Sequence, residues 1–123
     1  MGWTPVDLLI PDVDMFRFGN ASSTKLDSLR PNDATIEIRN GAPYIIADGK
    51  GQSLFDRFGA DTFPVTGVAY LLPAGTTLPG GMRLVNDIEH HYNLAPIYDM
   101  RLAEFLSLCR VLALQLTFAF KKK

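Results

Sequence analysis

Short alternating or apolar segments separated by turn signals dominate the first hundred residues of this chain. Thr35–Arg39 alternates in polarity, and Asn40-Gly41 after it is a strong hairpin signal leading into Tyr44–Ala47. The continuous apolar run at 68–72 is typical of a strand covered on both faces. The same reasoning predicts further strands at Met15–Phe18, Met82–Val85 and Tyr92–Ala95.

Helical periodicity is strongest near the C-terminus. Apolar residues recur at helical spacing from Met100 or Arg101 to about Phe118, and Asp99 is placed to cap the start. A shorter helix is predicted at Ser23–Leu29. Many short strands, one long C-terminal helix and no strand–helix–strand alternation predict a single α+β domain over residues 1–123, with mostly antiparallel sheet.

Composition argues against non-specific nucleic-acid binding and favours a protein that works in a reducing compartment. The 123 residues carry a formal charge of -1, which lacks the basic surface that non-specific nucleic-acid binding requires. Cys109 is the single cysteine and lies among apolar residues, so we expect a buried, inert thiol in a reducing cytosol. Residues 1–10 lack the basic cluster of a cleavable signal peptide, and Phe105–Phe120 is too short and too polar for a membrane span.

Several common catalytic constellations are excluded by spacing. His90 and His91 are adjacent and cannot share one tetrahedral metal site, so no metal is predicted. The glycines at 49–51 lack the spacing of a phosphate loop, and no Gly-x-Ser-x-Gly elbow occurs.

Three scattered features remain as candidate chemistry. Arg17 lies between two aromatic residues on a short strand and suits a phosphate or carboxylate, unless it points to solvent. Ser53 follows a glycine-rich turn and is either a functional hydroxyl or a strand-start serine. His91 and Tyr92 open a strand and are either ligand-binding residues or an edge histidine and a packed tyrosine.

In combination these segments resemble the type VI secretion exported effector two family of ADP-ribosyltransferase-like toxins. In that family a Gly-x-Ser-x-Phe-Asp block precedes an aliphatic strand ending in Pro-x-Gly-Thr, and a His-Tyr-x-Ile/Leu-x-Pro strand and a Met-led helix follow. The corresponding segments here are 51–57, 70–79, 91–96 and 100–106, with a weaker match at 15–17.

The resemblance implies the ADP-ribosyltransferase fold, with two packed, mostly antiparallel sheets and NAD as substrate in the cleft between them. It assigns Arg17 to the pyrophosphate or ribose, Ser53 to the nicotinamide ribose and His91 to ribose or phosphate. Phe55, Tyr70 or Tyr92 is expected to stack on nicotinamide.

The chain departs from the family in its acidic residue. Many ADP-ribosyltransferases carry a late-strand glutamate in a Gln-x-Glu or Glu-x-Glu pattern, which this sequence lacks. Among Asp87, Glu89 and Glu104, Glu89 lies nearest the His91 strand and is the catalytic candidate, with a solvated turn carboxylate as the alternative. Transfer of ADP-ribose, hydrolysis of NAD and binding without transfer therefore stay open.

The resemblance also implies a toxin of bacterial competition that acts in the cytoplasm on an unidentified macromolecule. A cognate immunity protein or antitoxin is expected to neutralise it, and export without a cleavable signal peptide fits a contact-dependent system. Two other functions stay open. One is an RNA-directed transferase of the same fold. The other is a non-enzymatic binding module that uses the helix, since Leu108, Val111 and Leu114 lie partly off its core-facing stripe.

Overall fold

The computed structural model describes residues 7–123 and confirms the α+β class, with two antiparallel sheets and two helices. The first half of the chain contains β1 (Asp7–Leu8), β2 (Met15–Gly19), β3 (Ile36–Arg39), β4 (Ala42–Ile45), β5 (Gln52–Phe55) and α1 (Arg57–Thr62). The second half contains β6 (Gly67–Leu72), β7 (Met82–Ile88), β8 (His91–Pro96), β9 (Met100–Arg101), α2 (Leu102–Ala113) and β10 (Thr117–Lys122).

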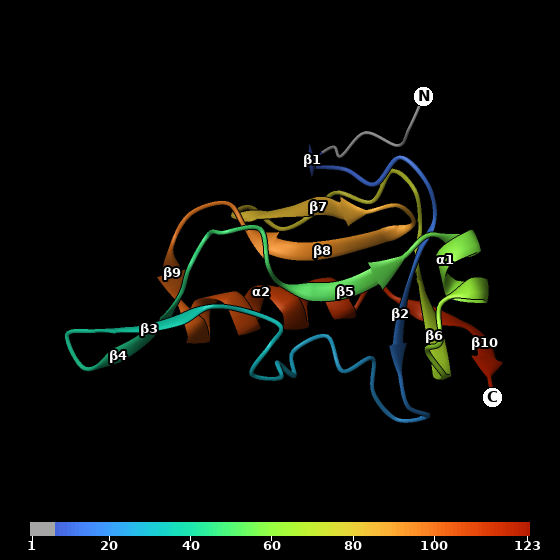
Figure 1. Cartoon of the computed structure of the whole chain (residues 1–123), viewed down its shortest axis with the longest axis horizontal. Coiled ribbons are helices and arrows are strands. Elements are labelled where there is room, and N and C mark those ends of the chain that lie inside the picture. Colours follow the sequence, from blue (N-terminus) through green and yellow to red (C-terminus); the bar gives the residue numbers. More distant parts are fainter. Residues whose placement is uncertain (1–6) are drawn as a thin grey trace.

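The larger sheet consists of two halves that cross. Its strand order is β1-β7-β8-β5-β2-β6-β10, and only the Phe16–Phe55 pair joins β2 to β5. In Figure 1, β5, β7 and β8 run across the molecule, whereas β2, β6 and β10 run nearly perpendicular to them. The two halves therefore diverge directly beyond the β2–β5 junction, and this divergence opens the space that the candidate site uses.

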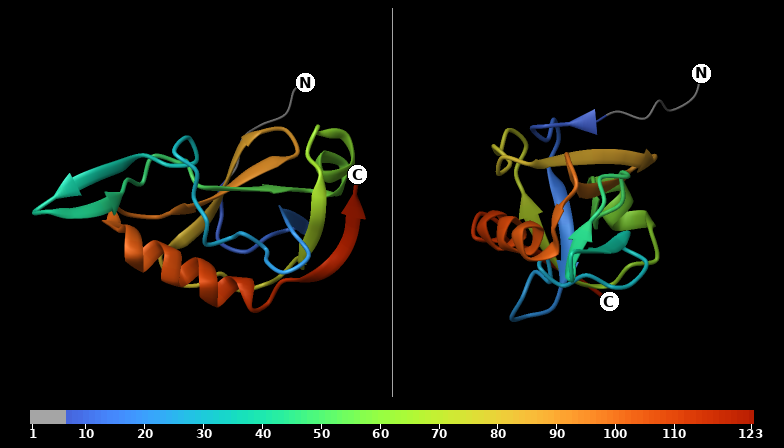
Figure 2. Two further views of the ribbon diagram at one scale, coloured as in Figure 1. Left: turned by 90° about the horizontal axis from the view of Figure 1, so that it is seen from below. Right: turned by 90° about the vertical axis from the view of Figure 1, so that its left-hand side faces the viewer.

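The smaller sheet, β3-β4-β9, projects from the main body as a hairpin (Figure 2). Its turn is the predicted Asn40-Gly41 pair, whose φ angles of 52° and 79° place both residues in the left-handed region that this turn requires. Strand β4 begins two residues earlier than predicted, because Arg39 pairs with Ala42 directly across the two-residue turn.

Helix α2 covers one face of β5, β7 and β8 and forms the main core. Phe105, Cys109 and Leu112 are its buried residues, and they belong to the same cluster as Leu54 and Leu94 of the sheet. A separate aromatic cluster, centred on Phe16 and Phe55, lies in the other half of the molecule with α1. The polar face of β5 and β8 is thus left for the site.

The C-terminal helix is shorter than predicted, and its N-cap residue is Arg101, not Asp99. It ends at Ala113, and Thr117–Lys122 instead forms β10 on the open edge of β6, a position that suits β-branched and aromatic residues. Asp99 does not cap the helix, because Met100 and Arg101 pair with β4 before the helix begins. The Asp99 carboxylate accepts hydrogen bonds from Ala47 N and Arg39 Nη2 instead.

The predicted helix at Ser23–Leu29 is absent from the described structure. The segment is an irregular loop, and side chains of the large sheet bind the carbonyl groups that a helix would use internally. The other strand predictions are confirmed to within a residue or a few, and the buried Cys109 thiol is confirmed. No helix of the described residues is long and apolar enough to cross a membrane. The signal-peptide prediction falls largely on residues 1–6, which lie outside the described residues.

Candidate functional site

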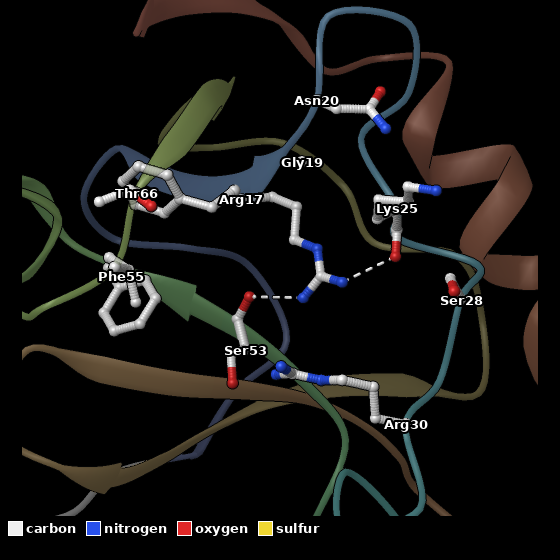
Figure 3. A pocket seen from close by; sticks show the side chains of 11 residues that line it. Arg17, Gly19, Asn20, Lys25, Ser28, Arg30, Ser53, Phe55 and Thr66 are labelled. Carbon is white, nitrogen blue, oxygen red and sulfur yellow. Dashed lines mark hydrogen bonds between the residues drawn. The ribbon is translucent and has the colours of Figure 1, made fainter. Parts of the chain in front are cut away.

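A pocket of about 530 Å³ lies beyond the point where β2 and β5 diverge, a volume typical of small-molecule sites. Figure 3 shows the Arg17 guanidinium at the backbone carbonyl of Ser53, with Phe55 beside them and Lys25 and Arg30 on the opposite loop. Its lining includes three cations, Arg17, Lys25 and Arg30, and no aspartate or glutamate. This composition favours an anionic ligand.

The Arg17 side chain links strand β2 to the two other walls of the pocket, strand β5 and the loop at 24–25. Its guanidinium donates from Nε to Thr24 O (3.1 Å), from Nη1 to Ser53 O (3.1 Å) and from Nη2 to Lys25 O (2.7 Å). Burial lowers the pKa of this guanidinium, since only 9% of the residue is exposed. All three of these partners are carbonyl oxygens, so no carboxylate among the described residues forms an ion pair with the charge.

Gln52 also binds this loop through its side-chain amide. Its Nε2 donates to Leu26 O (2.7 Å) and Ser28 O (2.9 Å), and the side chain is fully buried. Arg17 and Gln52 therefore fix four consecutive or nearly consecutive carbonyls of the segment that carries Lys25 and Arg30 into the pocket. This is the physical reason that the segment is a wall of the site and not a helix.

Ser53, His91 and Asp87 form a chain of hydrogen bonds at the edge of this pocket. His91 Nε2 lies 3.0 Å from Ser53 Oγ, and His91 Nδ1 lies 2.5 Å from Asp87 Oδ1. A carboxylate only accepts hydrogen bonds, so Nδ1 carries a hydrogen; when this is the only ring hydrogen, Nε2 presents its lone pair to the Ser53 hydroxyl. A second pocket of about 300 Å³ adjoins this chain and shares Ser53 with the first.

Asp87 lies at a β-bulge of β7. Val85 pairs with Asn93 but Ile88 pairs with His91, so β7 carries one extra residue at this point. In a regular ladder Asp87 would lie directly opposite His91; the bulge moves it back between His91 and Asn93. The Asn93 Nδ2 donates to Asp87 Oδ2 (3.2 Å) and so helps to fix the carboxylate.

The Gly-x-Ser-x-Phe-Asp block has a physical role at each of its fixed positions. A Cβ on Gly51 would lie 1.8 Å from Leu94 O, so only glycine allows β5 to begin this close to β8. Ser53 contacts His91 as described, and the Phe55 ring lies 5.0 Å from the His91 ring. Asp56 caps α1 through Gly59 N and also contacts His90 Nδ1 at 2.7 Å, which ties α1 to the β7–β8 turn.

The remaining predicted residues lie outside the pocket. Tyr92 points into the main core beside Leu54 and Leu94, where burial raises the pKa of its phenol, so it is not placed to stack on a ligand. The Tyr70 hydroxyl donates to Asn20 O (2.6 Å), and neither tyrosine is among the lining residues. Glu89 lies in the β7–β8 turn, mostly exposed, with its carboxylate 3.5 Å from His90 and not on His91.

Sequence reasoning missed Lys25, Arg30 and Gln52, and it ranked Asp87 behind Glu89. No local signal marks the first three, because a loop fixed by distant side chains brings them to the pocket. The bulge in β7 is equally invisible in the sequence. Among residues 7–123, no cluster of three or more potential ligand side chains is arranged to hold a metal ion.

The fold and the site define an α+β protein with a cationic pocket next to a serine–histidine pair. The family model of the Tse2 ADP-ribosyltransferase toxin matches residues 11–118, which is most of the chain and includes every residue of the site. The chain therefore belongs to the Tse2 ADP-ribosyltransferase toxin family, a family of bacterial toxins. No curated protein matches the chain significantly.

Proposed function

We propose that this protein binds NAD in the pocket between β2 and β5 and transfers its ADP-ribose group to a macromolecule of the intoxicated cell. The observation that carries the proposal is a pocket lined by three cations and no carboxylate, which opens onto the Ser53–His91 pair. The family supplies the reaction class, and the pocket supplies the chemistry that fits its substrate.

The cations suit the pyrophosphate of NAD. Neither Arg17 nor Lys25 forms an ion pair with a carboxylate among the described residues, while Arg30 shares its charge with Asp33 at 3.5 Å. A guanidinium has five N–H groups, and the three carbonyl bonds leave two for a ligand. A diphosphate bound here would therefore find a buried cation already held in place.

The Ser53 hydroxyl and the Phe55 ring suit the nicotinamide riboside end. Since Ser53 donates its hydrogen to His91, its lone pairs are available to a ribose hydroxyl. Phe55 lines the pocket and is held by His91 and by Phe63, whose ring centroid is 5.1 Å away. Cleavage of the ribose–nicotinamide bond passes through an oxocarbenium-like state, as in glycoside hydrolysis, so the proposed reaction requires this end of the site to stabilise a developing positive charge. We assign nicotinamide stacking to neither Tyr70 nor Tyr92, and we assign no catalytic role to Glu89.

A cytoplasmic target, a cognate immunity protein or antitoxin, delivery through a type VI or similar contact-dependent system and a role in bacterial competition belong to the same proposal. They rest on the family assignment, in which the chain is a toxin. A toxin of this kind requires protection of the cell that makes it.

Incubation with NAD labelled in its adenylate phosphate and with a bacterial lysate tests the proposed activity. We expect label on a macromolecule and release of nicotinamide, and we expect Ser53→Ala to lose both while Ser107→Ala, on the outer face of α2, retains them. Loss of the label on protease treatment assigns a protein target, and loss on RNase treatment assigns an RNA target. Wild-type protein that neither binds nor cleaves NAD refutes the proposal.

A second candidate function, a binding module, is favoured by the exposed apolar end of α2. Val111 is 52% exposed and Leu114 is 86% exposed, so this end of the helix carries apolar surface that the core does not use. Growth of cells that express the chain separates the two functions. Folded Ser53→Ala that stays fully toxic favours binding, whereas Val111→Ser/Leu114→Ser protein that stays toxic favours catalysis.

A further inference from the structure

The pocket contains no carboxylate, although the proposed reaction develops positive charge in it. The Asp87 carboxylate is joined to the pocket through His91 and Ser53. It is 39% exposed, whereas the His91 side chain between it and Ser53 is 13% exposed. No other aspartate or glutamate of the described residues contacts His91 in an ion pair or hydrogen bond.

We infer that Asp87 is the positioning residue of the site, which fixes the His91 tautomer and so turns the Ser53 oxygen toward the substrate. The inference rests on the proposed use of NAD and deepens it. Asp87 holds the hydrogen of His91 on Nδ1, and Nε2 then accepts the Ser53 hydrogen. The Ser53 lone pairs, polarised by the negative charge behind the histidine, accept a hydroxyl of the nicotinamide ribose.

The surroundings of Asp87 are built for this role. Asp87 Oδ1 also accepts from Ile88 N (2.9 Å), and Oδ2 accepts from Asn93 Nδ2 (3.2 Å), so both oxygens are fixed. The His91 ring packs against two aromatic rings, with Phe55 at 5.0 Å edge-on and Phe63 at 6.3 Å nearly parallel. These contacts hold the plane of the imidazole, and Asp87 then decides which nitrogen faces Ser53.

The transfer balances without a further reactant. The bond between the ribose C1′ and the nicotinamide nitrogen breaks, and its electron pair leaves with nicotinamide. A lone pair of the acceptor forms the new bond to C1′, and the proton of the acceptor passes to solvent. Asp87 takes no part in bond making; it stabilises the positive charge through the Ser53–His91 chain.

The experiment compares Asp87→Asn with the surface control Asp61→Asn, which removes the same charge from an exposed pair with Arg57. An asparagine amide can donate to Nδ1, which favours the tautomer with hydrogen on Nε2. We expect kcat for nicotinamide release to fall about 10- to 100-fold with KM for NAD changed less than about twofold, since positioning groups act on catalysis more than on binding. Asp87→Glu restores the carboxylate and is expected to recover part of the lost kcat. Thermal unfolding of each variant verifies that it is folded.

Nitrogen-15 NMR of the imidazoles supplies a readout that needs no substrate. In wild-type protein we expect His91 to carry its hydrogen on Nδ1, and in Asp87→Asn we expect a shift toward Nε2; His90→Gln assigns the signals, since His90 is the other histidine. An unchanged tautomer in folded Asp87→Asn overturns the inference, as does a loss of kcat in Glu89→Gln that equals the loss in Asp87→Asn. If wild-type protein does not cleave NAD, the proposed function fails while the NMR result still decides the role of Asp87.

Discussion

Replacement of Arg17 by lysine tests how much the hydrogen bonds of the guanidinium stabilise the walls of the pocket. Arg17→Lys keeps a cation on β2, but a single ammonium cannot reach Ser53 O on one side and the Thr24 and Lys25 carbonyls on the other. The change therefore removes about two of three charge-assisted hydrogen bonds. Each such bond contributes about 1.5–3 kcal/mol to stability, and with only 9% of the residue exposed there is little water to replace them.

The expected loss is about 3–6 kcal/mol, a large fraction of the roughly 5–15 kcal/mol that stabilises an ordinary domain. For a domain of this size that corresponds to a fall in Tm of about 12–23 °C. Circular dichroism measures the unfolding, with Arg110→Lys as the matched control because its ion pair with Asp27 is exposed. The control is expected to change stability by less than about 1 kcal/mol.

Two results would refute this reasoning about Arg17. The first is an Arg17→Lys protein that melts within about 3 °C of wild type, since the carbonyl clamp would then contribute little stability. The second is full NAD affinity in the folded variant, because the proposed pyrophosphate contact uses the fork geometry as well as the charge. Calorimetric titration with NAD at low temperature measures that affinity.

Three further predictions concern the rest of the fold. Burial raises the pKa of the Cys109 thiol to about 12, so a disulfide reagent at pH 7 should label it only after denaturation; stoichiometric labelling of native protein would contradict this. Hydrogen bonds from Ala47 N and Arg39 depress the pKa of Asp99, so Asp99→Asn should lower Tm at pH 7. The difference in Tm from wild type should shrink as the pH falls below about 4, because the Asp99 carboxylate is then protonated. A difference in Tm that stays constant with pH would argue against a stabilising Asp99 carboxylate. Lys122→Met should destabilise the protein by about 1–3 kcal/mol in a urea titration, because the Ala60 and Phe63 carbonyls at the end of α1 lose their donor. An effect no larger than that of Lys123→Met would disprove this prediction.

The sequence predicted those parts of the fold that local chemistry decides. The Asn40-Gly41 hairpin follows from the left-handed φ angles that these two residues tolerate, and the alternation or apolar character of the β2, β6 and β8 segments follows from which faces are covered. The order of motifs was enough to predict the family, and the family model confirms that assignment. Arg17, Ser53 and His91 were named as site residues, and the structure brings them together around the pocket.

Long-range hydrogen bonds decided the rest. Thr117–Phe120 is compatible with a helix until the open edge of β6 pairs with it, and Ser23–Leu29 loses its helix to the Arg17 and Gln52 side chains. The choice of acidic residue depends on how β7 and the β7–β8 turn lie against β8, which places Asp87 beside His91 and leaves Glu89 in solvent. A pattern of residues along the chain determines which faces are apolar, but the register between strands distant in sequence determines which carboxylate meets the histidine, and only the folded sheet fixes that register.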